Sequence, residues 1–135
     1  MLFEQLEVGQ AAEFTKTVTE TDVVMYAGIT GDFNPMHVDQ TYAQTTQFGG
    51  RIAHGMLTAG FVSAVLGMKL PGEGSIYMTQ SLRFTRPVRI GDTITARIEV
   101  IELFPQKKRV RLATACRNQN GEVVLDGEAL VLMQA

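Results

Sequence analysis

The sequence has few of the residues that build disulfide frameworks, metal centres or nucleic-acid interfaces. Of its 135 residues only one is cysteine, Cys116, two are histidine, and none is tryptophan. A lone cysteine excludes a disulfide within one chain and favours a reducing compartment, the cytoplasm. The net charge of −2 is not the basic excess that proteins binding nucleic acid usually carry.

Long apolar runs are also lacking, and no segment is predicted to be a signal peptide or a membrane span. The first residues contain no basic segment followed by an apolar one. The most apolar stretch, residues 54–68, is too short for a bilayer and is interrupted by Gly60 and Gly67. The length and the hydrophobic fraction of 45% suit one globular domain with a core. We therefore expect a single cytoplasmic domain over residues 1–135, with neither membrane nor nucleic acid as a partner.

The stretch from His54 to Met68 is apolar on every side of a helical wheel, which predicts a helix buried on every side. Gly55 at its start allows another group to approach closely, and the free N–H groups of a first turn suit a polarised oxygen. Ser63 and Thr58 are the only hydroxyls in the stretch. A buried hydroxyl needs a partner, so Ser63 either faces a bound molecule or bonds the carbonyl four residues earlier.

The rest of the chain predicts strands and short helices around this central helix. Alternation of polar and apolar residues indicates a strand over 13–18, and apolar positions indicate short helices near 23–29 and 40–45. Between these helices Pro35 ends the first one in a turn. Four later strands are predicted, the last two joined by a hairpin at Asn120-Gly121, over residues 75–85, 93–104, 108–118 and 123–133.

This order of elements predicts an α+β fold in which an antiparallel sheet wraps around a long central helix. Strands of this length leave unpaired edges and one uncovered face. We expect two chains to pair their sheets in a homodimer, which would cover these surfaces.

The two histidines are the groups best suited to proton transfer near neutral pH. Asp32 and His37 lie five residues apart across the Pro35 turn, so a loop must bring them together as an acid/base pair. A purely structural role, in which Asp32 caps a turn, stays open. His37 and Asp39 also have the H-x-D form of a metal site, with His54 as a further ligand. Such sites usually lie on barrel strands, and we predict no metal here.

The segment Asp32-Phe33-Asn34-Pro35-Met36-His37, followed by His54-Gly55-Met56, resembles the hydratase motif of the MaoC-like family, D-x-N-P-x-H and then H-G-M. The similarity continues through residues 71–77, 80–84 and 91–92. Members of this family are hot-dog-fold (R)-specific enoyl-CoA hydratases. The chain is similar in size to short bacterial members that feed β-oxidation intermediates to polyhydroxyalkanoate synthesis.

The resemblance implies a hot-dog homodimer that adds water reversibly to a trans-2-enoyl-CoA, giving an (R)-3-hydroxyacyl-CoA without any cofactor. It places Asp32 and His37 as catalytic residues and the backbone N–H of Gly55 as the oxyanion hole. Ser63 falls on a polar, substrate-binding position. Leu66, three residues later, is predicted to share the face of Ser63 and to form the floor of the acyl pocket.

Other functions stay open on the sequence alone. Within the same fold the alternatives are a 3-hydroxyacyl-thioester dehydratase acting on a carrier protein and an acyl thioesterase. A thioesterase is expected to use a carboxylate from the central helix, which has no Asp or Glu. A non-catalytic acyl-CoA-binding dimer is a further alternative. Basic residues suited to the phosphates of coenzyme A, none of which is assigned that role, are Arg51, Arg83, Arg86, Arg89, Lys107, Lys108, Arg109 and Arg111.

Overall fold

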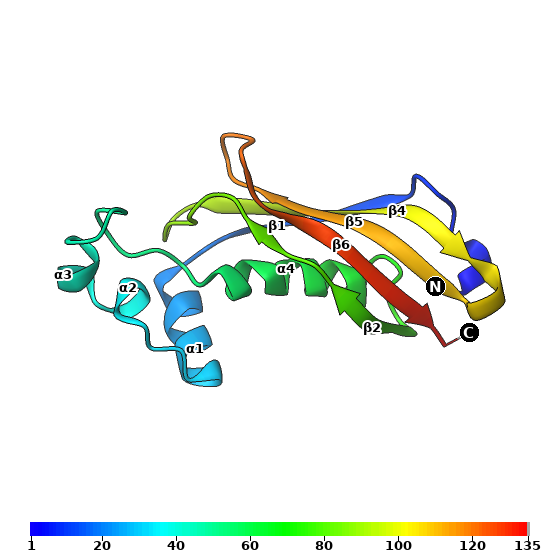
Figure 1. Ribbon diagram of the computed structural model, residues 1–135, viewed down its shortest axis with the longest axis horizontal. Coiled ribbons are helices and arrows are strands. Elements are labelled where there is room, and N and C mark those ends of the chain that lie inside the picture. Colours follow the sequence, from blue (N-terminus) through cyan, green and yellow to red (C-terminus); the bar gives the residue numbers. More distant parts are fainter. Residues whose placement is uncertain (135) are drawn as a thin grey trace.

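The computed structural model describes residues 1–134 and shows an antiparallel sheet lying along one long helix (Figure 1). The strand order is β1-β4-β5-β6-β2, and β3 also pairs with β6. The strands are β1 (Ala11–Thr17), β2 (Ser75–Gln80), β3 (Arg83–Phe84), β4 (Thr93–Phe104), β5 (Arg109–Arg117) and β6 (Val123–Met133). The helices are α1 (Glu20–Thr30), α2 (Pro35–Val38), α3 (Gln40–Ala43) and α4 (Gly55–Met68), with 3₁₀ turns at Phe3–Gln5 and Pro105–Lys107. The predicted α+β fold is confirmed.

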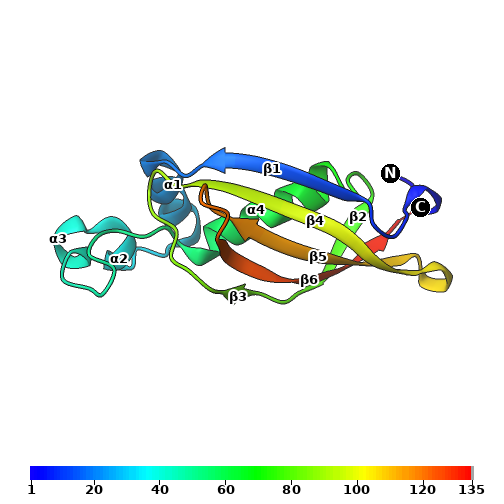
Figure 2. The same cartoon turned by 90° about the horizontal axis from the view of Figure 1, so that it is seen from above.

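The core lies between the sheet and α4. Seen from above, the strands of the sheet pass over this helix (Figure 2). In β4 and β5 every second side chain points toward the helix, and the period-two alternation of these strands places apolar residues there. The fully buried members of this layer are Ile94, Ala96, Ile98, Val100, Val110, Leu112 and Cys116. From the helix, Val62 and Val65 pack against them.

The prediction that α4 is buried on every side is wrong for a single chain. Val62, Val65 and Leu66 face the sheet and are buried. The sheet covers only this side of the helix, and the opposite side stays exposed. The exposed positions, most of them apolar or small, are Met56, Gly60, Ser63, Ala64, Gly67 and Met68. Within residues 1–134, no helix has both the length and the apolar character needed to cross a membrane.

Three short helices form a separate cluster beyond the N-terminal end of α4 (Figure 1). The first of them, α1, begins at a reciprocal cap: Asp22 N donates to Thr19 Oγ1 at 3.1 Å, and Thr19 N donates to Asp22 Oδ2 at 2.9 Å. It ends at Gly31, whose φ of 83° is a left-handed conformation that glycine adopts without strain. Capping residues thus set both ends of α1.

The helix α2 was not predicted from the sequence. Pro35 does prevent α1 from running on, but it also starts α2, because the first position of a helix needs no N–H donor. Asn34 caps this helix by accepting a hydrogen bond from Met36 N at 3.1 Å. This single turn of helix carries His37.

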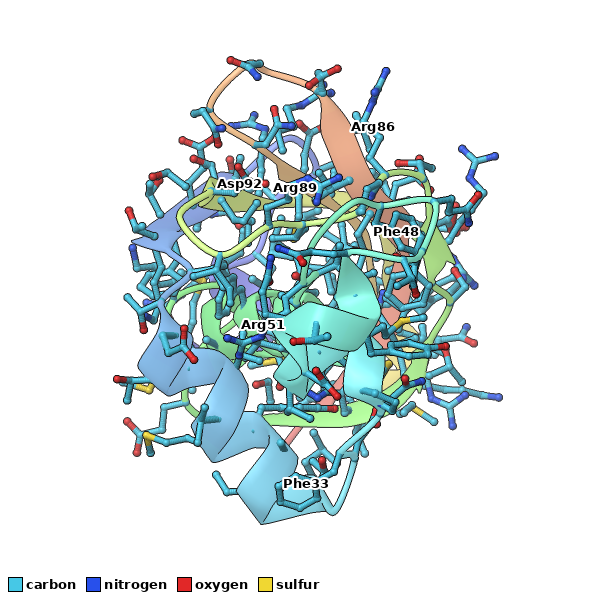
Figure 3. The ribbon with its side chains drawn as sticks, turned by 90° about the vertical axis from the view of Figure 1, so that its left-hand side faces the viewer. Phe33, Phe48, Arg51, Arg86, Arg89 and Asp92 are labelled. Carbon is cyan, nitrogen blue, oxygen red and sulfur yellow. The ribbon has the colours of Figure 1, made fainter. Side chains whose placement is uncertain are left out.

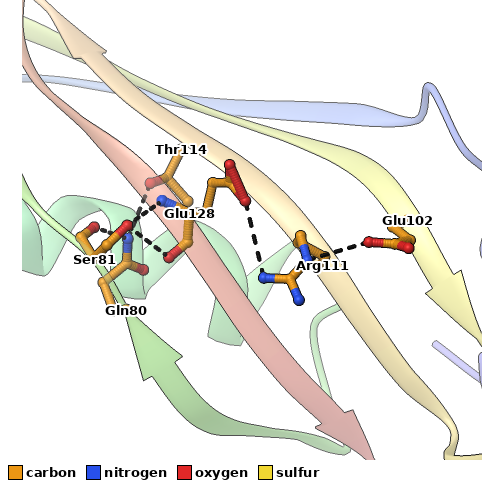
Figure 4. A network of polar contacts seen from close by, with 6 residues as sticks. All are labelled: Gln80, Ser81, Glu102, Arg111, Thr114 and Glu128. Carbon is orange, nitrogen blue, oxygen red and sulfur yellow. Dashed lines mark hydrogen bonds and ion pairs between the residues drawn. The ribbon is translucent and has the colours of Figure 1, made fainter.

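The predicted strand over 75–85 is in fact two strands, β2 and β3. Between them the carbonyl of Ser81 lies where a Cβ at Gly127 would stand, so glycine allows the chain to pass close to β6. Gln80, the last residue of β2, donates from Nε2 to Thr114 Oγ1 at 3.0 Å (Figure 4). Contacts with residues far away in the sequence therefore interrupt the strand.

Candidate active site

The turn between α1 and α2 and the start of α4 bring three titratable side chains together. One polar atom each of Asp32, His37 and His54 lies within 4.8 Å of the other two. The turn is held locally, because Asp32 Oδ1 accepts from Asn34 N at 3.2 Å and Asp32 N donates to Thr30 Oγ1 at 3.2 Å. The structure thus places the predicted pair, Asp32 and His37, at one spot.

His37 is buried, with 7% of its surface exposed, and its ring is oriented by a backbone carbonyl. Nδ1 donates to Ile52 O at 2.7 Å, since a carbonyl oxygen can only accept. Burial is the main cause that lowers the pKa of His37 from its ordinary value of 6.5, and the nearby charge of His54 lowers it further. At neutral pH the ring is therefore uncharged, and its Nε2 has a free lone pair that can take a proton.

His54 immediately precedes α4. The sequence indicates it only as one of the two histidines, as part of the motif and as a candidate metal ligand. Its ring stacks on that of His37, with 3.9 Å between ring centroids and 29° between the planes. Its Nε2 donates to the backbone carbonyl of Asp32 at 2.9 Å. The sequence gives no signal for this stack, because a turn and two helix ends must form before the rings can meet.

The first turn of α4 offers free backbone donors next to this cluster. Within the described chain, neither Gly55 N nor Met56 N donates a hydrogen bond. A Cβ at Gly55 would lie 2.7 Å from a ring carbon of Phe84, so only glycine fits without a shift. A cavity of about 440 Å³ is lined by His37 and Gly55 together with largely apolar side chains, among them Phe48 and Phe84. The cavity thus lies between the His37 imidazole and the positive, N-terminal end of α4.

The H-x-D metal arrangement considered in the sequence is not present. Asp39 lies outside the cluster and caps α3, with Oδ1 accepting from Tyr42 N at 3.1 Å. Asp32 occupies the place next to the histidines instead. Asp32, His37 and His54 each bring one ligand-type atom within 4.8 Å of the others, but Nδ1 of His37 and Nε2 of His54 are already bonded to backbone carbonyls.

Ser63 and Leu66, which are predicted to share a face of α4, differ in exposure. Three residues turn a helix by roughly 300°, which leaves about 60° between the two side chains. Ser63 is exposed and lines a second cavity, of about 410 Å³, between α4 and β2. Leu66 is 2% exposed and belongs to the core, as does Val62. Leu66 lines neither of the two cavities, and its place at the floor of the acyl pocket stays a prediction.

Several of the basic candidates gather at the end of the molecule that carries α1–α3. Figure 3 shows Arg51, Arg86 and Arg89 on this end. Arg51 is partly buried; its Nε donates to His37 O at 2.7 Å and its guanidinium pairs with Glu20 at 2.8 Å. Arg86 borders the cavity that contains His37. The cluster over residues 107–111 lies at the opposite end of the sheet (Figure 1).

Residues 4–121 match the model of a family described as the MaoC like domain. The chain belongs to the MaoC-like family. It is 54% identical to an (R)-specific enoyl-CoA hydratase from Rhodospirillum rubrum, with 98% of this chain and 92% of the relative covered. It is 53% identical to a 3-hydroxybutyryl-CoA dehydratase from Methylorubrum extorquens, with 97% and 83% covered.

Among solved structures, an (R)-hydratase from Aeromonas caviae involved in PHA biosynthesis superposes on this MaoC-like chain with a TM-score of 0.93. The two sequences are 44% identical, and the match covers 96% of this chain and 98% of that one. The predicted hot-dog fold is thereby confirmed.

Proposed function

We propose that this MaoC-like chain is an (R)-specific enoyl-CoA hydratase, a hydro-lyase that needs no cofactor. One observation supports this most strongly. His37, whose imidazole has a nitrogen with a free lone pair, and the unpaired N–H groups at a helix start border one largely apolar cavity, and a carboxylate oxygen of Asp32 lies within 4.8 Å of a ring nitrogen of His37. The relatives from Rhodospirillum rubrum and Methylorubrum extorquens carry the names of the two directions of one reaction, hydration and dehydration.

Gly55 is proposed to stabilise the charge that develops on the thioester oxygen. The thioester already polarises the double bond, and attack of water at C3 leaves enolate-like charge on the carbonyl oxygen. A fixed N–H donor in a dry site stabilises such charge well, and one donor typically contributes about 3 kcal/mol. In this chain that N–H points from the positive end of α4 and has no partner of its own among residues 1–134.

Asp32 and His37 are proposed to hold the attacking water and to move its protons. One of the two takes a proton from the water as its oxygen attacks C3, and a proton is then delivered to C2 from the same face. The reverse sequence of steps removes water from a 3-hydroxyacyl thioester.

A homodimer is proposed as the working assembly. The exposed side of α4 contains small and apolar residues, among them Gly60, Ala64 and Met68. Next to it β2 is the last strand of the sheet, with one unpaired edge. A second copy that covers both would bury this surface and enclose Ser63, so that the hydroxyl borders a closed acyl site.

We also propose a cellular location and a metabolic role. A single cysteine, Cys116, is fully buried, which fits a reducing cytoplasm. The Aeromonas caviae (R)-hydratase is described as taking part in PHA biosynthesis. We propose that the product of this chain is used in the same way, for polyhydroxyalkanoate synthesis.

Incubation with crotonyl-CoA tests the proposal. We expect the enoyl absorbance to fall, (R)-3-hydroxybutyryl-CoA to accumulate and the thioester to survive. A longer enoyl-CoA and an enoyl-carrier-protein thioester, assayed in parallel, show which carrier is used. Free thiol appearing as fast as the absorbance falls would make the chain a thioesterase, and a tightly bound but unchanged thioester would make it a binding protein.

A further inference from the structure

His54 is a buried imidazole to which the proposed reaction gives no role. It is 2% exposed, yet it touches both residues of the catalytic pair. Its ring stacks on His37 with centroids 3.9 Å apart, and its Nε2 donates to the backbone carbonyl of Asp32 at 2.9 Å. From α1 the ring of Tyr26 packs against it at 4.6 Å. The side chain therefore links three segments: α1, the turn that carries Asp32, and α2.

The second ring nitrogen of His54, Nδ1, makes no hydrogen bond within residues 1–134 and does not cap the helix. Nδ1 is buried and has no hydrogen-bond partner among the described residues. It does not cap α4 either, although His54 occupies the capping position. Buried polar atoms without partners are rare in folded proteins. An amide or hydroxyl side chain would cap the helix better. The features of His54 that the structure uses at this position are therefore its aromatic ring and its Nε2 donor.

We propose that His54 is a positioning residue for the Asp32–His37 pair. Its hydrogen bond holds the turn that carries Asp32, and its stacked ring holds the plane of His37, so the carboxylate and the free Nε2 stay at one spot. This inference rests on the proposed hydratase function. Acid/base catalysis requires groups within hydrogen-bond reach of the transferred proton. Loosening the pair should therefore lower kcat more than it changes KM.

Two substitutions separate the two contacts of His54. His54→Phe keeps a flat ring against His37 but removes the donor to Asp32. His54→Gln keeps an N–H donor but removes the ring. Tyr26→Phe is the matched control, because it keeps the ring that packs on His54 and removes only its hydroxyl.

Because the chain has so few histidines, the titration of the His37 imidazole can be measured directly. The chain has two histidines, so in a tag-free His54 variant the only imidazole resonance in a proton NMR titration is that of His37. The titratable groups facing the His37 ring are Asp32 and His54, while Arg51 contacts its backbone carbonyl. Since the charge of His54 lowers the pKa of His37, its removal should move the His37 titration to higher pH.

We expect both His54 variants to lose at least about tenfold in kcat with crotonyl-CoA, because a small displacement of a catalytic group is costly. KM should change less than about threefold, the His37 titration should move to higher pH, and Tyr26→Phe should match the wild type. If His54→Phe does not fold, His54→Gln decides alone. Variants with kcat within twofold of the wild type would overturn the inference, as would activity lost only in proportion to the unfolded fraction with an unchanged His37 titration. A wild type that does not hydrate crotonyl-CoA would overturn the proposed function, and this inference with it.

Discussion

At the scale of single residues, the site depends on which nitrogen of each imidazole carries the proton. Nδ1 of His37 is committed to the carbonyl of Ile52, which leaves Nε2 free at neutral pH. Nε2 of His54 is committed to the carbonyl of Asp32. Backbone carbonyls thus fix both rings. Nδ1 of His54 is buried without a partner among the described residues, whereas His37 lines the cavity, so Nε2 of His37 is the nitrogen assigned to proton transfer.

Asp32→Asn and His37→Gln should each abolish most of the hydratase activity while the protein stays folded. Each change keeps the shape and the hydrogen-bonding ability of the side chain but removes its acid/base function. Such a function typically contributes 10²–10⁴-fold to the rate, roughly 3–5 kcal/mol. Steady-state kinetics with crotonyl-CoA and a melting curve on the same sample give the measurement. Near-normal turnover in either variant would show that the acid/base assignment is wrong.

The pair Asp32 and His37 could be predicted from the sequence because both lie in one short motif around Pro35. The contribution of His54 could not, since its stack with His37 depends on the path of the chain between α2 and α4. For Leu66, helical spacing from Ser63 gives an angle between two side chains but does not say which of them faces the sheet.

At the scale of secondary structure, the start of α4 determines what the site can do. The predicted helix over 54–68 differs from α4 by one residue, because its apolar pattern is long and regular. The single turn of α2 is too short to show a period. The break between β2 and β3 depends on Gly127, more than forty residues further along the chain. Local patterns therefore located the helix but not the segments fixed by distant contacts.

Gly55→Ala tests the close approach at this helix start. The new Cβ would lie 2.7 Å from the Phe84 ring, so either the ring or the helix must shift, which typically costs about 1–3 kcal/mol. We expect lower stability in denaturant unfolding and lower kcat as the Gly55 N–H moves. Phe84→Ala is the control, and in the double variant the stability loss should be smaller than the sum of the two single losses. Additive losses would show that the two residues do not clash.

Leu66→Ala tests where the acyl pocket ends. Because Leu66 is 2% exposed in the core, its truncation should lower the free energy of unfolding by about 2–5 kcal/mol. The ratio of kcat/KM for a longer enoyl-CoA to that for crotonyl-CoA should stay unchanged. A ratio shifted toward the longer substrate would instead place Leu66 at the floor of the pocket.

At the scale of the whole molecule, the two outer surfaces of the layered fold differ: the outer face of the sheet is charged, and the free side of α4 is not. The outer face of the sheet carries paired charges, such as Arg111 with Glu102 at 3.3 Å (Figure 4). The free side of α4 carries no such pairs and includes Met68, which is 82% exposed. A contiguous apolar surface of this kind is typical of an interface between subunits, which supports the proposed homodimer.

Ala64→Arg tests this assembly. We expect the wild type to sediment at twice its chain mass of 14.8 kDa, and the variant to sediment as a monomer, because a charge is buried without a partner in the contact. Ala113→Arg is the control, since its neighbours across the outer face are Glu99 and Glu128. A dimeric Ala64→Arg protein would place the interface elsewhere.

Asp32 and His37, held at one spot, are proposed to add both parts of water to the same face of the substrate. Hydration of crotonyl-CoA in D₂O is the decisive measurement, because the deuterium delivered to C2 marks the face from which it came. We expect one monodeuterated diastereomer of (R)-3-hydroxybutyryl-CoA, with deuterium and hydroxyl added from the same face. Addition from opposite faces, or a mixture of both diastereomers at early times, would contradict it.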